Sequence, residues 1–263
     1  MNSALDLPLL RFALVYILLL AVLWLMKKAR IHKTALLITA SMRMTVQLIL
    51  AGLLLTWIFK HPHPLLTLGY VCAMVLFAIH RVLSQHRGLN KRFQWVVAAS
   101  LAGSGLAVLL FFVCLVVGVN ITEAQYTIPL GGMIIGNAMT GLSLALNTFE
   151  QNLAANTNRL ASLLNWGAHP QDIVRPMANA ALETALLPTI NSMLGTGIVW
   201  LPGMLTGQIL AGTLPTTAIL YQIAIMIAIC AVVCLAVFCS LYFGCHTLYD
   251  KHYRLILANP PKE

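Results

Sequence analysis

Seven runs of about 20 mostly apolar residues follow one another along this chain and leave little room for anything else. A helix of that length crosses the hydrocarbon core of a bilayer, where only helices and closed barrels satisfy their own backbone amides. The composition agrees, because 60% of the residues are hydrophobic and 9% are charged, whereas soluble domains carry about 25% charged residues. We therefore predict an all-α polytopic membrane protein, one transmembrane domain over residues 1–263 with about seven membrane helices. The expected spans are Leu7–Met26, Ala35–Phe59, Leu65–Ile79, Phe93–Gly118, Tyr126–Leu146, Leu187–Ala211 and Ala218–Phe243.

Basic residues alternate between the loops and predict the orientation of the chain. The loops after the first, third, fifth and last spans are rich in Lys and Arg, while those between them carry Lys60, Glu123 or no charge. Since basic loops stay in the cytoplasm, we expect the N-terminus outside and the C-terminus in the cytoplasm. The net charge of +9 follows from this topology, so nucleic-acid binding is not expected. The basic loop residues are Lys27, Lys28, Arg30, Lys33, Arg81, Arg87, Lys91, Arg92, Arg159, Arg175, Lys251, Arg254 and Lys262.

The fifth and sixth spans carry more Gly, Pro, Asn and Thr than a plain membrane anchor needs. A broken backbone or an unpaired amide in hydrocarbon costs several kcal/mol unless protein or a water-filled path satisfies it. We expect Pro188 and Pro202 to interrupt the sixth span, and we interpret both segments as lining a path for a polar solute. Packing and helix bridging are the plainer roles for such residues. The candidate path residues are Gln47, Met133, Asn137, Met139 and Met204.

Small residues also repeat at every fourth position in these two spans. Such repeats let helix backbones approach closely, either within one chain or across a dimer seam, and the sequence leaves both possibilities open. The repeats are Gly132, Gly136 and Thr140, and Gly203, Gly207 and Ala211.

The longest connection covers residues 147–186, and we expect it to form a helical elbow on the cytoplasmic side. Leucines recur on one face of its first half. Gly167 is placed to cap a first helix, and Pro170 to begin a second one. Two roles stay open for this elbow. It is either a hairpin lying on the lipid or a contact surface for a cytoplasmic partner, with Trp166 as an anchor.

Metal-binding side chains are scarce in the expected spans, which hold no Asp or Glu in their interiors. His61 and His63 on the outer side are weak metal candidates, as are Cys230 and Cys234, which share one helix face. Exposed loop histidines and small apolar cysteines more often bind nothing. An intramembrane enzyme is not expected, because the chain lacks a His-Glu-x-x-His motif, a Gly-x-Ser-x-Gly motif and paired carboxylates.

Five sequence blocks occur here in a single order: Arg43–Gln47, Ile128–Met139, Leu164–Pro170, Ala185–Ile190 and Leu201–Gly207. Together they resemble the FetB-type permeases of ABC transporters. These are membrane subunits associated with bacterial iron export, and their plant relatives are linked to aluminium tolerance. The resemblance covers almost the whole chain. It implies a homodimeric, multi-pass permease of the bacterial inner membrane, which exports iron or another metal ion with a separate cytoplasmic ATPase. The coupling residues implied are Leu160, Leu164, Trp166, Gly167, Ala168, His169 and Pro170.

One departure from the family pattern concerns the substrate. Iron-linked members carry an Asp and a Lys shortly after the Pro-Thr pair of the sixth span, where this chain has Asn191 and Leu194. Asn191 therefore joins the candidate path residues, and the transported species stays open.

The chain itself is not expected to hydrolyse ATP. Gly131 and Gly136 have the spacing of P-loop glycines, but Asn137 and Ala138 stand where Lys and Ser or Thr would hold phosphate and Mg²⁺. We thus expect no cofactor on this chain, with ATP and Mg²⁺ bound by the partner subunit. The main alternative is an ATP-independent secondary transporter or channel, although such carriers usually hold a membrane-embedded acid that is missing here.

Overall fold

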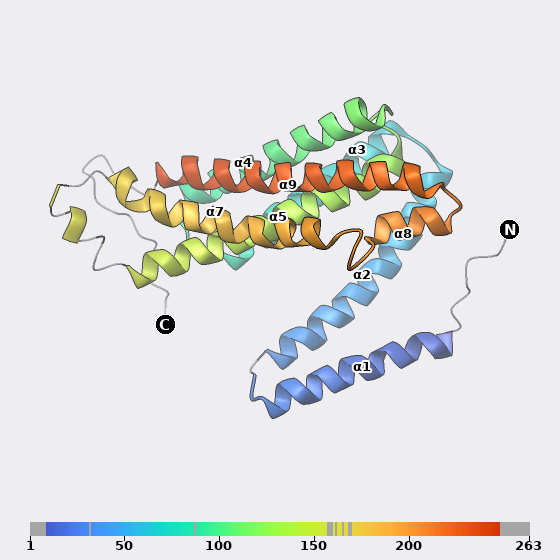
Figure 1. Cartoon of the computed structure of the whole chain (residues 1–263), viewed down its shortest axis with the longest axis horizontal. Helices are drawn as coiled ribbons and strands as arrows, with labels where there is room; N and C mark the ends of the chain where they lie inside the picture. The colour runs from blue at the N-terminus through green and yellow to red at the C-terminus, as the bar shows by residue number, and fades with distance from the viewer. Residues whose placement is uncertain are drawn as a thin grey trace. The chain divides into compact units, whose positions relative to one another are not determined.

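The computed structural model describes residues 9–31, 33–86, 88–156, 160, 162–164, 166–167 and 170–247. Helices dominate these residues, which contain no strand beyond one isolated bridge between Thr196 and Trp200. The chain divides into two compact units, Met1–His61 and Pro62–Glu263. The helices of each unit are coloured along the chain in Figure 1.

The first unit is a helical hairpin made of α1 (Leu9–Lys28) and α2 (Thr34–Lys60). The Tyr16 hydroxyl lies 2.9 Å from Thr45 Oγ1 and joins the two helices by a hydrogen bond. Most described side chains of both helices are apolar and exposed. Exposed apolar helices of this length suit a lipid environment.

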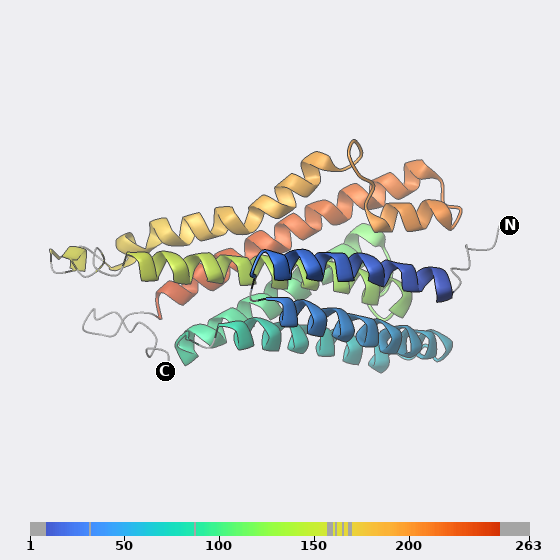
Figure 2. The ribbon, with the colours of Figure 1, turned by 90° about the horizontal axis from the view of Figure 1, so that it is seen from below.

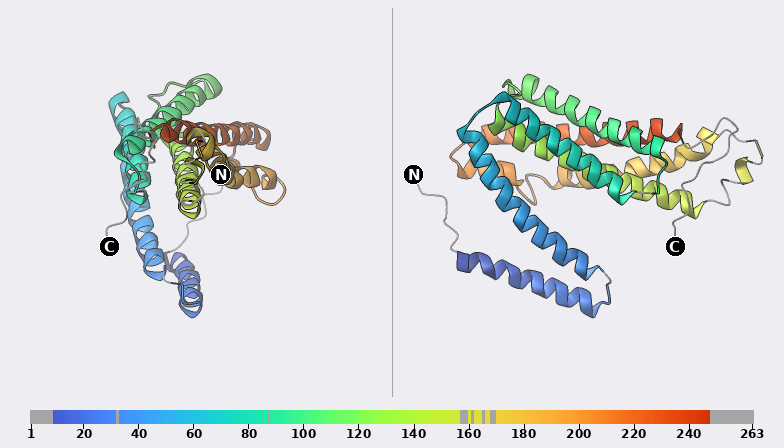
Figure 3. Two further views of the ribbon diagram at one scale, coloured as in Figure 1. Left: turned by 90° about the vertical axis from the view of Figure 1, so that its left-hand side faces the viewer. Right: turned by 180° about the vertical axis from the view of Figure 1, so that it is seen from behind.

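The second unit is a bundle in which α9 has the central place. It packs against α4, α5, α7 and α8. Figures 1 and 2 show α9 running beside its neighbours in the bundle. The view from behind in Figure 3 shows α3 and α4 along the face away from α7. Its helices are α3 (Pro64–Gln85), α4 (Lys91–Leu110), the π-helix η1 (Phe111–Val117), α5 (Ala124–Ala155), α7 (Pro170–Gly195), α8 (Gly203–Leu210) and α9 (Pro215–Cys245).

The bundle core is built from buried aliphatic and aromatic side chains with very small residues at the closest approaches. Phe93 of α4 stacks on Phe149 of α5, with ring centroids 6.3 Å apart. Gly244 leaves room for the Phe93 ring, and Gly141 leaves room for Val233. In a bilayer, where lipid competes equally for apolar surface, such close packing is what holds helices together.

The predicted all-α, polytopic membrane fold is confirmed. Five helices among the described residues are long and apolar enough to cross a membrane: α2, α3, α4 with η1, α5 and α9. The third span is longer than the sequence indicated, because α3 continues to Gln85. At about 1.5 Å per residue, the 32 residues of α5 extend about 48 Å, more than the roughly 30 Å of hydrocarbon they have to cross.

The sixth span is broken, as expected, but only one of the two prolines marks the break. Pro188 lies inside α7, which continues to Gly195, so interruption at Pro188 is wrong. The helix stops before residues 196–202, and Pro202 is the residue that precedes α8. A proline inside a membrane helix is tolerated when neighbouring helices accommodate it, and α7 packs on both α5 and α9.

The connection predicted over 147–186 is mostly made of the ends of two long helices. α5 continues through Ala155, and α7 begins at Pro170. Between them, residues 160 and 162–164 are helical. The single transmembrane domain and the coupling role of this region stay predictions.

Candidate functional site

A cavity of about 590 Å³ lies where α5, α8 and α9 meet, and we refer to it as the α5–α8 cavity. It brings together Met133 and Met204, two predicted path residues that lie far apart in the sequence. None of its lining residues is charged, so its donors are thioethers, amides and hydroxyls. The lining residues are Gln125, Tyr126, Pro129, Leu130, Met133, Met204, Gln208, Thr213 and Tyr221.

On the α5 side, the cavity borders a proline inside the helix. Pro129 lies inside α5 and has no N–H to donate to the carbonyl of Gln125, four residues earlier. Both residues line the cavity. On the α8 side, the side-chain carbonyl oxygen of Gln208 is buried and has no hydrogen-bond partner among the described residues. This oxygen is one of the few buried polar atoms of the described residues that the protein leaves unsatisfied.

The other predicted path residues lie outside this cavity. Asn137 is exposed, and its Nδ2 donates a hydrogen bond to the Met133 carbonyl at 2.7 Å. Met139 is partly buried against the core. Asn191 is exposed on α7, and Gln47 is exposed on α2 in the first unit. Helical spacing places a residue on a face, but the packing of neighbouring helices decides which face borders a cavity.

A second cavity, of about 580 Å³, lies beside the break between α7 and α8. We refer to it as the α7–α9 cavity. Among its lining residues is Gln222, a glutamine that the sequence analysis did not select, near the start of α9, the most apolar of the candidate membrane helices. A search of the sequence for polar residues inside membrane spans would have found this glutamine. The same search would have found Gln208.

The predicted coupling residues occupy the end of the second unit where α5 finishes and α7 begins. Leu160 is buried, and Leu164 packs partly buried against the core. Trp166 is 89% exposed. Gly167 has a φ of +82°, the left-handed conformation of a capping glycine, and its N–H donates to the Leu164 carbonyl at 3.0 Å. Ala168 and His169 lie outside the described residues, and α7 begins at Pro170.

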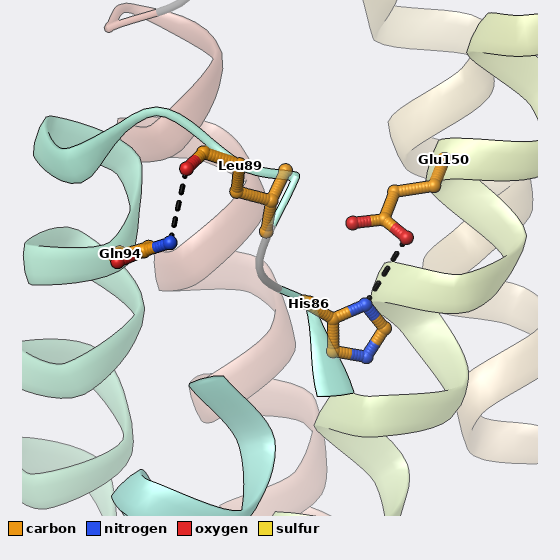
Figure 4. Close-up of polar contacts among 4 residues, drawn as sticks. All are labelled: His86, Leu89, Gln94 and Glu150. Carbon is orange, nitrogen blue, oxygen red and sulfur yellow. Dashed lines mark hydrogen bonds and ion pairs between the residues drawn. The ribbon is translucent and has the colours of Figure 1, made fainter. Parts of the chain in front are cut away.

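A buried histidine, which the sequence analysis did not select, lies at the same end of the bundle (Figure 4). His86 follows the last residue of α3, and its Nδ1 lies 3.2 Å from Oε2 of Glu150 on α5. The two atoms are within ion-pair distance but are not aligned as a hydrogen bond. Nearby, Nε2 of Gln94 donates to the Leu89 carbonyl at 3.0 Å and closes the turn into α4. These contacts hold the connection between α3 and α4 against the last turns of α5.

The weak metal candidates make local contacts instead of a shared site. The His61 Nδ1 lies 3.2 Å from the Trp57 carbonyl, and the His63 Nδ1 accepts the Leu65 N–H at 3.3 Å at the start of α3. Cys230 and Cys234 are half-buried on α9. In the part of the chain that the structure describes, no three His, Cys, Asp or Glu side chains gather into a metal cluster.

Comparison with known proteins gives one family over nearly the whole length. The profile of the uncharacterised protein family UPF0014 matches residues 9–249. The membrane protein YjkA of Bacillus subtilis is 33% identical over 76% of this chain and 78% of its own length. The probable iron export permease protein FetB of Escherichia coli is 28% identical over 84% of each chain. The protein ALUMINUM SENSITIVE 3 of Arabidopsis thaliana is 27% identical over 81% of this chain and 77% of its own length. No solved structure shows a significant match.

Proposed function

Because the chain belongs to the UPF0014 family of membrane proteins, we propose that it is the membrane-spanning permease of an ABC transporter that exports iron or another metal ion. What carries this proposal is the match over residues 9–249, together with a relative named as an iron export permease over most of both chains. The energy comes from ATP and Mg²⁺ bound on a separate cytoplasmic subunit. The protein is a transport subunit and not an enzyme.

The α5–α8 cavity supports a route for a cation through the second unit. Thioethers are neutral ligands for borderline and soft metal ions, and two methionines line this cavity. Met133 and Met204 supply the sulfur atoms. Neutral ligands bind an ion weakly enough to release it again, as transport requires.

The cytoplasmic end supports a docking surface for the ATPase. Trp166 is an exposed aromatic residue beside a tight turn, while Leu160 and Leu164 tie the same segment to the core. A force applied at the turn is therefore passed to α5 and α7, which contact each other along the bundle. The His86–Glu150 contact joins the connection between α3 and α4 to the same end of α5.

The homodimer and the orientation in the membrane belong to the same proposal. Added Cβ atoms at Gly136, Gly203 and Gly207 would meet no atom of the described chain within 4 Å. These small residues therefore make no close packing contact within one chain and leave room for a second copy. The alternating basic loops favour a bacterial plasma membrane protein with its N-terminus outside and its C-terminus in the cytoplasm.

The test is metal-stimulated ATP hydrolysis by the permease reconstituted in liposomes with a candidate ATPase subunit. Met133→Leu and Met204→Leu remove sulfur ligands at similar volume. Met139→Leu is the matched control, since Met139 also packs against the core but does not line the cavity. We expect the first two variants to need several-fold more metal for half-maximal stimulation, while the control behaves as wild type. Equal stimulation of all three variants would contradict a route through this cavity.

One observation favours the ATP-independent carrier as a second candidate. The break between α7 and α8 resembles the discontinuous helices of secondary transporters, whose ends bind ions near the middle of the membrane. Metal flux through liposomes that hold the permease alone, with no ATPase and no ATP, would favour this alternative.

A further inference from the structure

We propose that a groove between the first turns of α7 and the last turns of α9 binds the headgroup of phosphatidylethanolamine, a phospholipid that carries both a phosphate and a primary ammonium group. This lipid site is separate from the transport route proposed above. The two helices pack side by side (Figure 1). A cavity of about 240 Å³ lies between these ends of the helices, and we refer to it as the polar groove.

The first observation is a couple of opposite charges that the protein does not pair with each other. Asp172 and Arg175 lie three residues apart on α7, and both line the polar groove. Neither side chain makes an ion pair or a hydrogen bond with any described residue. The groove thus offers a carboxylate to an ammonium group and a guanidinium to a phosphate. These are the two charges of a phosphoethanolamine headgroup.

The second observation is a row of aromatic rings on the α9 side. Phe238, Tyr242 and His246 repeat at every fourth residue, and all three line the groove. The rings of Phe238 and Tyr242 stack with centroids 5.4 Å apart, and the His246 ring meets Tyr242 edge-on at 5.6 Å. Tyrosine is enriched at the headgroup level of a membrane. The face of such a ring also attracts the cationic group of a ligand.

The order of residues along the groove matches the order of groups in a phospholipid. Asp172 and Arg175 lie in the first two turns of α7, whereas Leu182 lies two turns further along the helix. On α9, Phe238 and Leu241 likewise lie further from the end of the helix than His246 does. The groove is therefore charged toward the helix ends and apolar toward the middle of the bundle. A soluble anion gains little from the apolar half, which fits the glycerol backbone and the start of an acyl chain.

The length of α9 places the groove at the level of the headgroups. Its 31 residues extend about 46 Å at about 1.5 Å per residue, and a bilayer with both headgroup regions is roughly 40–45 Å thick. When α9 begins at one surface of the membrane, its last two turns lie among the headgroups of the opposite leaflet. By the orientation proposed above, this is the cytoplasmic leaflet.

The chemistry of the groove predicts which headgroup it selects. The primary ammonium group of phosphatidylethanolamine donates up to three hydrogen bonds, and the Asp172 carboxylate and the side-chain oxygen of Asn179, which also lines the groove, are acceptors for them. Phosphatidylcholine has a bulkier quaternary ammonium group with no N–H to donate. Phosphatidylglycerol lacks a cationic group, and Asp172 repels its negative charge. We therefore expect a preference for phosphatidylethanolamine over both of the other lipids.

The experiment measures lipid binding to the full chain by native mass spectrometry in detergent, with one dioleoyl phospholipid added at a time. Phosphatidylethanolamine should bind at least about tenfold more tightly than phosphatidylcholine or phosphatidylglycerol, because it alone makes the charge-assisted bonds to Asp172. Asp172→Asn should weaken phosphatidylethanolamine binding about tenfold without weakening phosphatidylglycerol binding. Arg175→Gln should weaken the binding of both lipids. Asp172→Lys should reverse the preference, so that phosphatidylglycerol binds more tightly.

Two control variants make the same kinds of charge change outside the groove. Glu183→Gln neutralises an exposed carboxylate further along α7, and Arg92→Gln neutralises an exposed guanidinium at the start of α4. Both should bind phosphatidylethanolamine as the wild type does. The proposal is overturned if the wild type binds the three lipids alike, if Asp172→Lys keeps the wild-type preference, or if the controls lose the lipid as the groove variants do.

Two further measurements test other occupants of the groove. Soluble phosphoethanolamine has the headgroup without the acyl chains, so an equal concentration of it should leave the lipid bound. Displacement of the lipid would assign the groove to a soluble ligand and refute the proposal. The proposal is also refuted if Asp172→Lys abolishes co-purification of the ATPase subunit while its lipid binding stays that of the wild type, because the groove would then be a protein contact.

Discussion

Replacing Gly141 with alanine tests whether the contact between α5 and α9 is as close as the structure has it. A Cβ atom at this position would lie 2.6 Å from Cγ1 and 3.4 Å from Cγ2 of Val233. Val233 is 1% exposed, and a valine in a helix has one strongly preferred χ1 rotamer, so its methyl groups cannot turn away. The helices must therefore separate, or Val233 must adopt a strained rotamer.

The size of the effect follows from two opposing contributions. Overpacking a well-packed core costs about 1–3 kcal/mol. Alanine favours a helix over glycine by about 1 kcal/mol in water, but less of this is gained in lipid, where the helix persists when its neighbours separate. We therefore expect Gly141→Ala to lower the free energy of unfolding by about 1–2 kcal/mol.

The assay is equilibrium unfolding of the monomer in mixed micelles, followed by circular dichroism as the denaturing detergent increases. Gly136→Ala is the matched control on the same helix, because its added Cβ would meet nothing within 4 Å. Val233→Ala should rescue Gly141→Ala, and the double variant should show coupling of about 1 kcal/mol or more. If Gly141→Ala and Gly136→Ala unfold alike, and Val233→Ala has no rescuing effect, the close approach of these two helices is wrong.

Three further predictions concern the two ends of the molecule and its buried amide. Without metal, Gln222→Leu should raise the free energy of unfolding by about 1–2 kcal/mol, because it removes an unpaired buried amide. Thermal denaturation measures this, and a midpoint for the variant below that of the wild type would show that the amide is in fact satisfied. Trp166→Ala should weaken association with the ATPase by about 2 kcal/mol, and Gly167→Val should strain a left-handed residue by about 1–2 kcal/mol and reduce transport. Co-purification of a tagged ATPase measures the association, and flux assays measure transport. If both variants associate and transport as the wild type does, this turn is only an interfacial hairpin. A cysteine introduced at Thr213 should be labelled by an impermeant reagent from outside, and one at Trp166 only from inside, while the reverse pattern would contradict the orientation.

Features that depend on neighbours in the sequence could be predicted without the structure. The helical spans follow from apolar length, and the start of α7 at Pro170 and the left-handed Gly167 follow from local backbone preferences. The break in the sixth span was also predictable. Its position was not, because the pattern cannot tell that packing on α5 and α9 carries α7 through Pro188.

Features that depend on how helices turn toward one another were decided only by the tertiary structure. The sequence marked Gly132 and Gly136 as close-packing residues, yet the tightest glycine on α5 is Gly141, whose place is set by Val233 on α9. Periodicity defines the faces of one helix, but it contains no information about which helix meets each face or at what height. For the same reason, Met133 and Met204 could be chosen by residue type alone. Their shared cavity, and the burial of Gln222 beside the end of α7, exist only once α8 is folded between α5, α7 and α9.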